Sequence, residues 1–148
     1  MANGSYSPDG IFYPFPSEEE SKKEAEALEN ITAEEKRKGR EIVAVQGLGF
    51  VGCIMAAVVA DAEDLNGNPC YFVHGVQRPS SRSYWKIPVI NEGKPPVEST
   101  DPEVPEIFKR TVLEKKTLRA TWHEKAYEVA DIVVVDIQLD ATKPKFGS

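Results

Sequence analysis

One hexapeptide constrains the fold of this chain more than any other feature, the sequence Gly-Leu-Gly-Phe-Val-Gly at positions 47–52. It follows a continuously apolar run at 42–45, which is typical of a parallel strand buried on both faces. It precedes the run 53–60, whose small and apolar residues suit a helix that lies against a sheet. A turn sequence at 66–69 and a second strand pattern at 70–76 come next. A strand, a glycine loop, a helix and a second strand together predict a βαβ unit.

Glycines with this spacing, between a strand and a helix, are typical of the phosphate-binding turn of dinucleotide-binding folds. Gly47 allows the tight turn out of the strand, and a side chain at Gly49 would stand where a pyrophosphate must approach. Gly52 allows the helix to lie close to the strand, while Phe50 and Val51 direct backbone N–H groups toward the phosphates. The sequence therefore predicts a Rossmann-type dinucleotide site that includes Gly47, Leu48, Gly49, Phe50, Val51 and Gly52.

The residues after the second predicted strand leave the choice between NAD and NADP open. An acidic residue at this place normally binds the adenosine ribose, but here the strand ends at Gln77, which Arg78 follows. The Gln77 amide can hydrogen-bond a ribose hydroxyl without repelling a 2′-phosphate. Arg78 and Arg82, with Ser80 and Ser81 between them, can accept such a phosphate, although solvated loop charges explain them equally well.

The whole pattern favours an α/β domain behind an N-terminal extension. Residues 1–40 combine an arm with an acidic helical segment, predicted as the two helices 17–30 and 32–38. The apolar stripe of this segment is thin, so we expect it to be mostly solvated. Residues 41–148 are predicted to form a truncated Rossmann domain, a partial doubly wound parallel sheet of about four strands in the order 3-2-1-4. The fourth strand, 132–135, is expected to be buried.

Composition narrows the partners of the protein. A net charge of −6 argues against nucleic acid, whose phosphates require a basic surface. No apolar run approaches the ~20 residues that span a bilayer, and the N-terminus lacks a secretory signal. Cys53 and Cys70 form no metal-binding pattern and are expected to be reduced, mostly buried thiols. These features predict a cytoplasmic protein without a metal site or a membrane segment.

Few other side chains suggest chemistry. His74 lies within the second predicted strand and is expected to be a satisfied core histidine, and His123 has no obvious Asp or Ser partner nearby in the sequence. Asp136 and Asp140 flank a loop at the carboxyl end of a strand, where ligands bind in open α/β sheets, although loop capping explains them equally well. The sequence therefore predicts no catalytic residue in this chain.

The ordered series of segments at 41–136 resembles the N-terminal domain of the UDP-glucose/GDP-mannose dehydrogenase family. Beyond the glycine loop, the stretch 86–98 carries Lys-Ile, Asn-Glu-Gly and Pro-Pro-Val-Glu in the order that is similar to this family. Leu-Arg-Ala-Thr at 118–121 and Ala-Asp-Ile-Val-Val-Val at 130–135 resemble its third and fourth strands. Where the family has Val-Pro-Thr-Pro after the fourth strand, this chain has Ile-Gln-Leu-Asp at 137–140.

The resemblance implies the NAD-binding portion of a UDP-glucose 6-dehydrogenase-like enzyme of polysaccharide biosynthesis. Such an enzyme oxidises the primary alcohol of a UDP- or GDP-sugar to a carboxylate and transfers hydride to NAD. The resemblance places Gln77 at the ribose, makes Lys86 a basic cofactor contact, and sets Ile137 and Gln138 where the fourth strand meets the cofactor. The family's catalytic residues lie beyond this chain, so we expect a piece of a longer enzyme. The expected cofactor contacts are Gly47, Leu48, Gly49, Phe50, Val51, Gly52, Gln77, Arg78, Lys86, Ile137 and Gln138.

Two alternatives stay open at this point. The chain can be a non-catalytic dinucleotide-binding or regulatory module that senses NAD(H), with NADP as a second choice of cofactor. It can also carry a degenerate pocket in which only the fold survives, and ligand binding would exclude that case. An exposed, incomplete sheet edge can further pair with another copy and form a homo-oligomer.

Overall fold

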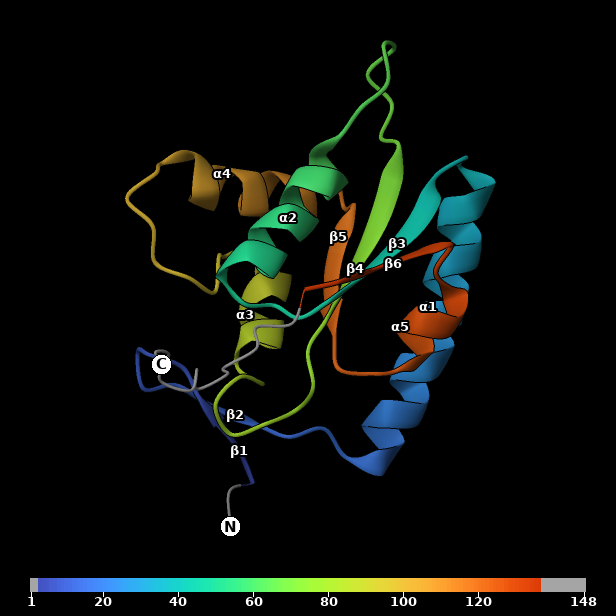
Figure 1. The fold of residues 1–148 in the computed structure, drawn as a ribbon. Helices are drawn as coiled ribbons and strands as arrows, with labels where there is room; N and C mark the ends of the chain where they lie inside the picture. Colours follow the sequence, from blue (N-terminus) through green and yellow to red (C-terminus); the bar gives the residue numbers. More distant parts are fainter. Residues whose placement is uncertain (1–2, 137–148) are drawn as a thin grey trace, which may run out of the picture.

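The computed structural model describes residues 3–136, which build a four-stranded sheet between two layers of helices (Figure 1). The strands are β3 (Glu41–Gln46), β4 (Tyr71–Val76), β5 (Leu118–Thr121) and β6 (Ile132–Val135). They lie in the order β5-β4-β3-β6, and every pair of neighbours is parallel. This is the 3-2-1-4 order expected from the sequence, so the predicted α/β fold with a partial Rossmann-type sheet is confirmed.

Helices cover both faces of this sheet. Those on one side are α2 (Phe50–Asp61), α3 (Lys86–Asn91) and α4 (Glu103–Lys109), which the π-helical turn η1 (Arg110–Glu114) continues. Those on the other side are α1 (Glu18–Arg37) and α5 (Lys125–Val129) (Figure 1). A small antiparallel hairpin, β1 (Gly4–Tyr6) and β2 (Phe12–Pro14), precedes α1. The larger core lies between the sheet and the α2 layer, where Val45, Val73 and Phe108 are completely buried.

Helix α1 has well-defined signals at both ends. The Ser17 hydroxyl accepts a hydrogen bond from the backbone N–H of Glu20, and the Glu20 carboxylate accepts one from the N–H of Ser17. At the other end, Gly39 has a φ of +91°, and the N–H of Arg40 donates to the carbonyl of Glu35 (3.2 Å). A residue with positive φ and this backbone bond are typical of a glycine-terminated helix.

The predicted division of this segment into two helices is wrong, because α1 is continuous. The hydroxyl of Thr32, which was expected to begin a second helix, instead hydrogen-bonds Nε2 of His74 in β4 at 3.1 Å. The expectation of a mostly solvated helix is confirmed, because most residues of α1 are exposed and only four are buried. Glu24, Leu28, Thr32 and Glu35 recur at helical spacing and are buried. The helix therefore packs on the sheet through a face that is largely polar.

Strand β6 is more exposed than the buried strand that was predicted. The side chains of Ile132, Val133 and Val135 are 41%, 45% and 58% exposed. This strand pairs with β3 along one edge, and no other described strand lies along its outer edge. An apolar strand is buried only where neighbouring strands or helices cover it, and the described residues cover β6 incompletely.

Candidate functional site

The glycine loop connects β3 to α2 in three residues and requires glycine at its first position. Gly47 has a φ of +99°, a conformation that side-chain-bearing residues rarely adopt. A Cβ atom there would also collide with the backbone carbonyl oxygen of Asp136, which follows β6. The N–H of Gly47 donates to the carbonyl of Val76 at 2.9 Å, so the loop is tied to the end of β4.

The N-terminus of α2 offers backbone donors at this loop. Gly49 is the N-cap and makes no side-chain capping bond, and the first turn carries no acidic residue. Among the described residues, none accepts a hydrogen bond from the N–H groups of Phe50 or Val51. A Cβ atom at Gly52 would collide with the carbonyl oxygen of Gly47, so this glycine lets the helix approach the loop. Free N–H groups and the helix dipole together favour an anion at this point.

A hollow of about 940 Å³ opens in front of this loop at the carboxyl ends of β3 and β4. Ligands of open parallel sheets bind at this end of the strands. The lining includes seven of the residues that the sequence predicts as cofactor contacts, whereas Leu48 and Gly52 are buried just behind the surface. The predicted contacts Ile137 and Gln138 lie outside the described residues. The lining residues are Gln46, Gly47, Gly49, Phe50, Val51, Val76, Gln77, Arg78, Lys86, Tyr127 and Asp136.

Two of the predicted contacts hold the loop itself. The side-chain oxygen of Gln77 accepts the N–H of Leu48 at 2.8 Å, and its amide nitrogen donates to Oγ of Ser83 at 3.3 Å. Nζ of Lys86 donates to the carbonyl of Leu48 at 3.2 Å. Gln77 and Lys86 therefore fix the N–H and the carbonyl group of Leu48, a role that the sequence did not indicate.

Charges of both signs border the hollow. Arg78 and Lys86 contribute the positive charges, and neither forms an ion pair with a described acidic residue. Asp136 contributes a carboxylate, whose Oδ2 lies about 3.0 Å from the position that a Cβ of Gly52 would take. This places an acid beside the first turn of α2, so the sequence-based expectation that Asp136 belongs to a pocket agrees with the lining of the hollow. Asp140 lies outside the described residues.

Sequence reasoning missed three of the lining residues. Gln46 and Val76 are the last residues of β3 and β4, so they could have been named from their positions next to the glycine loop and Gln77. Tyr127 comes from α5, and no local pattern in the sequence links it to the loop. Burial raises the pKa of Tyr127, the negative charge of Glu124 adds to this rise, and the positive charge of Arg78 opposes it. Tyr127 and Arg78 both line the hollow.

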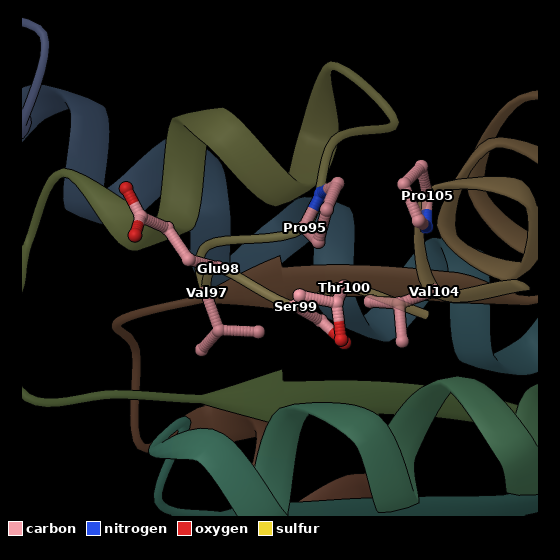
Figure 2. A pocket seen from close by; sticks show the side chains of 7 residues that line it. All are labelled: Pro95, Val97, Glu98, Ser99, Thr100, Val104 and Pro105. Atoms are coloured by element: carbon pink, nitrogen blue, oxygen red, sulfur yellow. The ribbon is translucent and has the colours of Figure 1, made fainter. Parts of the chain in front are cut away.

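A second hollow of about 610 Å³ lies along the loop between α3 and α4 (Figure 2). In Figure 2 the Glu98 carboxylate stands at one end of this hollow, and Val104 and Pro105 stand at the other. Its polar lining consists of Glu98, Ser99 and Thr100, without a cationic side chain. A dense anion such as pyrophosphate needs donors and positive charge, so the hollow at the glycine loop is the better candidate.

The two cysteines show no features of a nucleophile. Cys53 is buried in α2, where burial raises the pKa of its thiol to about 11. A thiol with a raised pKa is rarely ionised and reacts slowly. Cys70 is half-buried, and both thiols are free. Within residues 3–136, no group of three or more His, Cys, Asp and Glu side chains could hold a metal ion, and no helix has the length and apolar character to cross a bilayer.

Comparison with solved structures identifies a similar protein. The crystal structure of NDP-N-acetyl-D-galactosaminuronic acid dehydrogenase from Methanosarcina mazei Go1 matches 75% of this chain at 30% sequence identity, with a TM-score of 0.59. The chain is similar to part of a nucleotide-sugar dehydrogenase. It spans 22% of the length of that protein. No protein-family model matches the sequence, and no curated protein matches it.

Proposed function

We propose that this chain binds a nicotinamide dinucleotide in the hollow at the glycine loop, as the cofactor-binding portion of a nucleotide-sugar dehydrogenase. The observation that carries the proposal is the loop itself, which leads from a parallel strand to the N-terminus of α2, whose first N–H groups have no acceptor among residues 3–136. The similarity to a solved dehydrogenase of the same class supports it. The nicotinamide of such a cofactor accepts and returns a hydride.

The residues around the hollow fit this ligand. The N–H groups of Phe50 and Val51 would bind the pyrophosphate, which Gly49 would allow to approach closely. The positive charges of Arg78 and Lys86 would offset the charge of the phosphates. NAD is the cofactor that the family resemblance implies.

The substrate of the complete enzyme would be a UDP- or GDP-sugar. The solved neighbour is an NDP-N-acetyl-D-galactosaminuronic acid dehydrogenase, and this chain spans 22% of its length. Oxidation of the sugar therefore belongs to this proposal only as an activity of a complete enzyme. Burial raises the pKa of the Cys53 thiol to about 11, so this proposal gives Cys53 no catalytic role.

The experiment that tests dinucleotide binding is a calorimetric titration of the chain and its Gly49→Asp variant with NADH. Gly49 has the extended backbone of an N-cap, with φ −71° and ψ −172°, which aspartate adopts readily. The variant should therefore fold, while its carboxylate occupies and repels the pyrophosphate position. We expect saturable binding to the wild type and a loss of affinity of at least about tenfold in the variant.

The matched control is Leu65→Asp, which adds the same charge to the loop between α2 and β4. Leu65 is 105% exposed, and its loop leads into the amino end of β4, whereas the glycine loop follows the carboxyl end of the parallel strand β3. Figure 1 shows these two loops at opposite ends of the sheet. This variant should bind like the wild type. Equal binding by Gly49→Asp, or no NADH or NADPH binding by a wild-type chain that circular dichroism shows to be folded, would refute the proposal.

A further inference from the structure

The end of the hollow next to β4 carries an unusual set of side chains for a dinucleotide site. In βαβ dinucleotide folds, an acid after the second strand binds the ribose hydroxyls, and an arginine nearby accommodates a 2′-phosphate. The corresponding strand here is β4, and the residues that follow it are Gln77 and Arg78. No Asp or Glu occurs anywhere in the segment from Gln77 to Lys86. The feature that excludes a 2′-phosphate is therefore missing from this segment.

The side chain of Gln77 already forms two hydrogen bonds within the protein. Its side-chain oxygen accepts the N–H of Leu48 at 2.8 Å, and its amide nitrogen donates to Oγ of Ser83 at 3.3 Å. These bonds use one of the two acceptor positions and one of the two N–H groups of the amide, and neither remaining position carries a charge that would repel a phosphate. Gln77 thus holds the loop, and it presents no negative charge to the adenosine end of the hollow.

Arg78 is the side chain that can bind a phosphate at this end. It is exposed, lines the hollow and forms no ion pair with a described acid. The Ser83 hydroxyl donates to its backbone carbonyl at 3.4 Å, and Ser80 Oγ lies 2.6 Å from Ser83 Oγ, so this turn is held in place. Tyr127, from α5, lines the same hollow.

Arg82, the other arginine of this segment, has a different position. Its side chain is exposed and does not line the hollow, and its backbone carbonyl accepts the indole N–H of Trp85 at 2.8 Å. The sequence offers both arginines as candidates for binding a 2′-phosphate, but only Arg78 lines the hollow. This difference supplies a matched pair for an experiment.

We infer that the hollow accepts the 2′-phosphate of NADP(H) on the Arg78 guanidinium, so that the chain prefers NADP(H) to NAD(H). The inference rests on the proposed function, because it concerns the adenosine end of the same dinucleotide site. A phosphate monoester carries about 1.5 to 2 negative charges near neutral pH and bonds an arginine in a bidentate manner. Neutral Gln77 does not oppose this charge, whereas a carboxylate at the same position would.

The first experiment titrates the full chain with NADPH and with NADH by calorimetry. We expect NADPH to bind at least about tenfold more tightly, the effect of one charged hydrogen-bond pair. Adenosine 2′,5′-bisphosphate should show the same advantage over adenosine 5′-monophosphate, which isolates the 2′-phosphate. Equal or tighter binding of NADH would overturn the inference and leave the proposed function intact. Binding of neither dinucleotide by a folded chain would overturn both.

The second experiment compares two arginine variants with the same two ligands. Arg78→Ala should weaken NADPH binding about tenfold, so that the two affinities converge, whereas Arg82→Ala should keep the preference of the wild type. Gln77→Glu keeps an acceptor for the N–H of Leu48 and adds a negative charge, so it should shift the preference toward NADH. A preference that survives in Arg78→Ala, or that is lost in Arg82→Ala, would show that Arg78 is not the phosphate-binding residue.

Discussion

His74 is a titratable side chain that the fold buries completely in β4. The pKa of its imidazole is lowered from 6.5 to about 4, first by burial and then by the positive charge of Arg119, while the negative charge of Glu24 partly opposes both. Its Nε2 pairs with the Thr32 hydroxyl, while its Nδ1 has no partner among the described residues. The expectation of a core histidine is correct, but only one of its two nitrogens is satisfied within the described chain.

This histidine makes the stability of the protein depend on pH. Between pH 6.5 and about 4, His74 binds a proton in the unfolded chain but not in the folded one. Its contribution to the free energy of unfolding is therefore complete above pH 6.5 and falls by roughly 3 kcal/mol as the pH decreases to about 4. Urea unfolding at a series of pH values measures how the free energy of unfolding changes with pH. His74→Gln should reduce this dependence on pH, and His123→Gln should retain it. An equal dependence in the two variants would show that His74 is not its source.

At the scale of elements, α1 is held on the sheet by charged and polar groups. The Glu24 carboxylate accepts hydrogen bonds from the guanidinium of Arg119 at 2.5 and 2.6 Å and from Thr121 at 2.5 Å. Burial tends to raise the pKa of Glu24, but these hydrogen bonds outweigh it and hold the pKa below its ordinary value. Arg119 and Thr121 both lie in β5, so their hydrogen bonds to Glu24 join α1 to the edge of the sheet.

Removal of Arg119 should therefore release α1. Arg119→Ala leaves the Glu24 carboxylate buried without its counter-charge, which should lower the free energy of unfolding by about 3 kcal/mol. Arg37→Ala is the matched control, since its ion pair with Glu34 on the same helix is exposed to solvent and should contribute little to stability. Urea unfolding of both variants checks the difference. An Arg119→Ala variant as stable as Arg37→Ala would mean that apolar contacts alone fasten the helix.

At the scale of the whole molecule, the sequence predicts those features of the fold that depend on local patterns. The glycine loop and the apolar runs around it predict the βαβ unit and the order of the sheet, because each strand and helix has its own periodicity. The packing of α1 could not be predicted, since Glu24 meets Arg119 95 residues later in the chain. The hydrogen bond of Gln77 to the glycine loop and the approach of Tyr127 to the hollow likewise depend on side-chain contacts between distant elements.

The exposed edge of β6 leads to a prediction about assembly. Strand edges with exposed apolar side chains tend to pair with another strand, and β6 carries Ile132, Val133 and Val135 without a charged residue among them. We therefore expect the chain to self-associate as its concentration rises, which sedimentation velocity measures. Val133→Lys should raise the dissociation constant at least about tenfold, because lysines on facing edges repel and remain solvated. Val58→Lys, at an exposed apolar position on α2, should associate like the wild type. A wild-type chain that stays monomeric throughout, or a Val133→Lys variant that associates unchanged, would show that β6 is not the contact between copies.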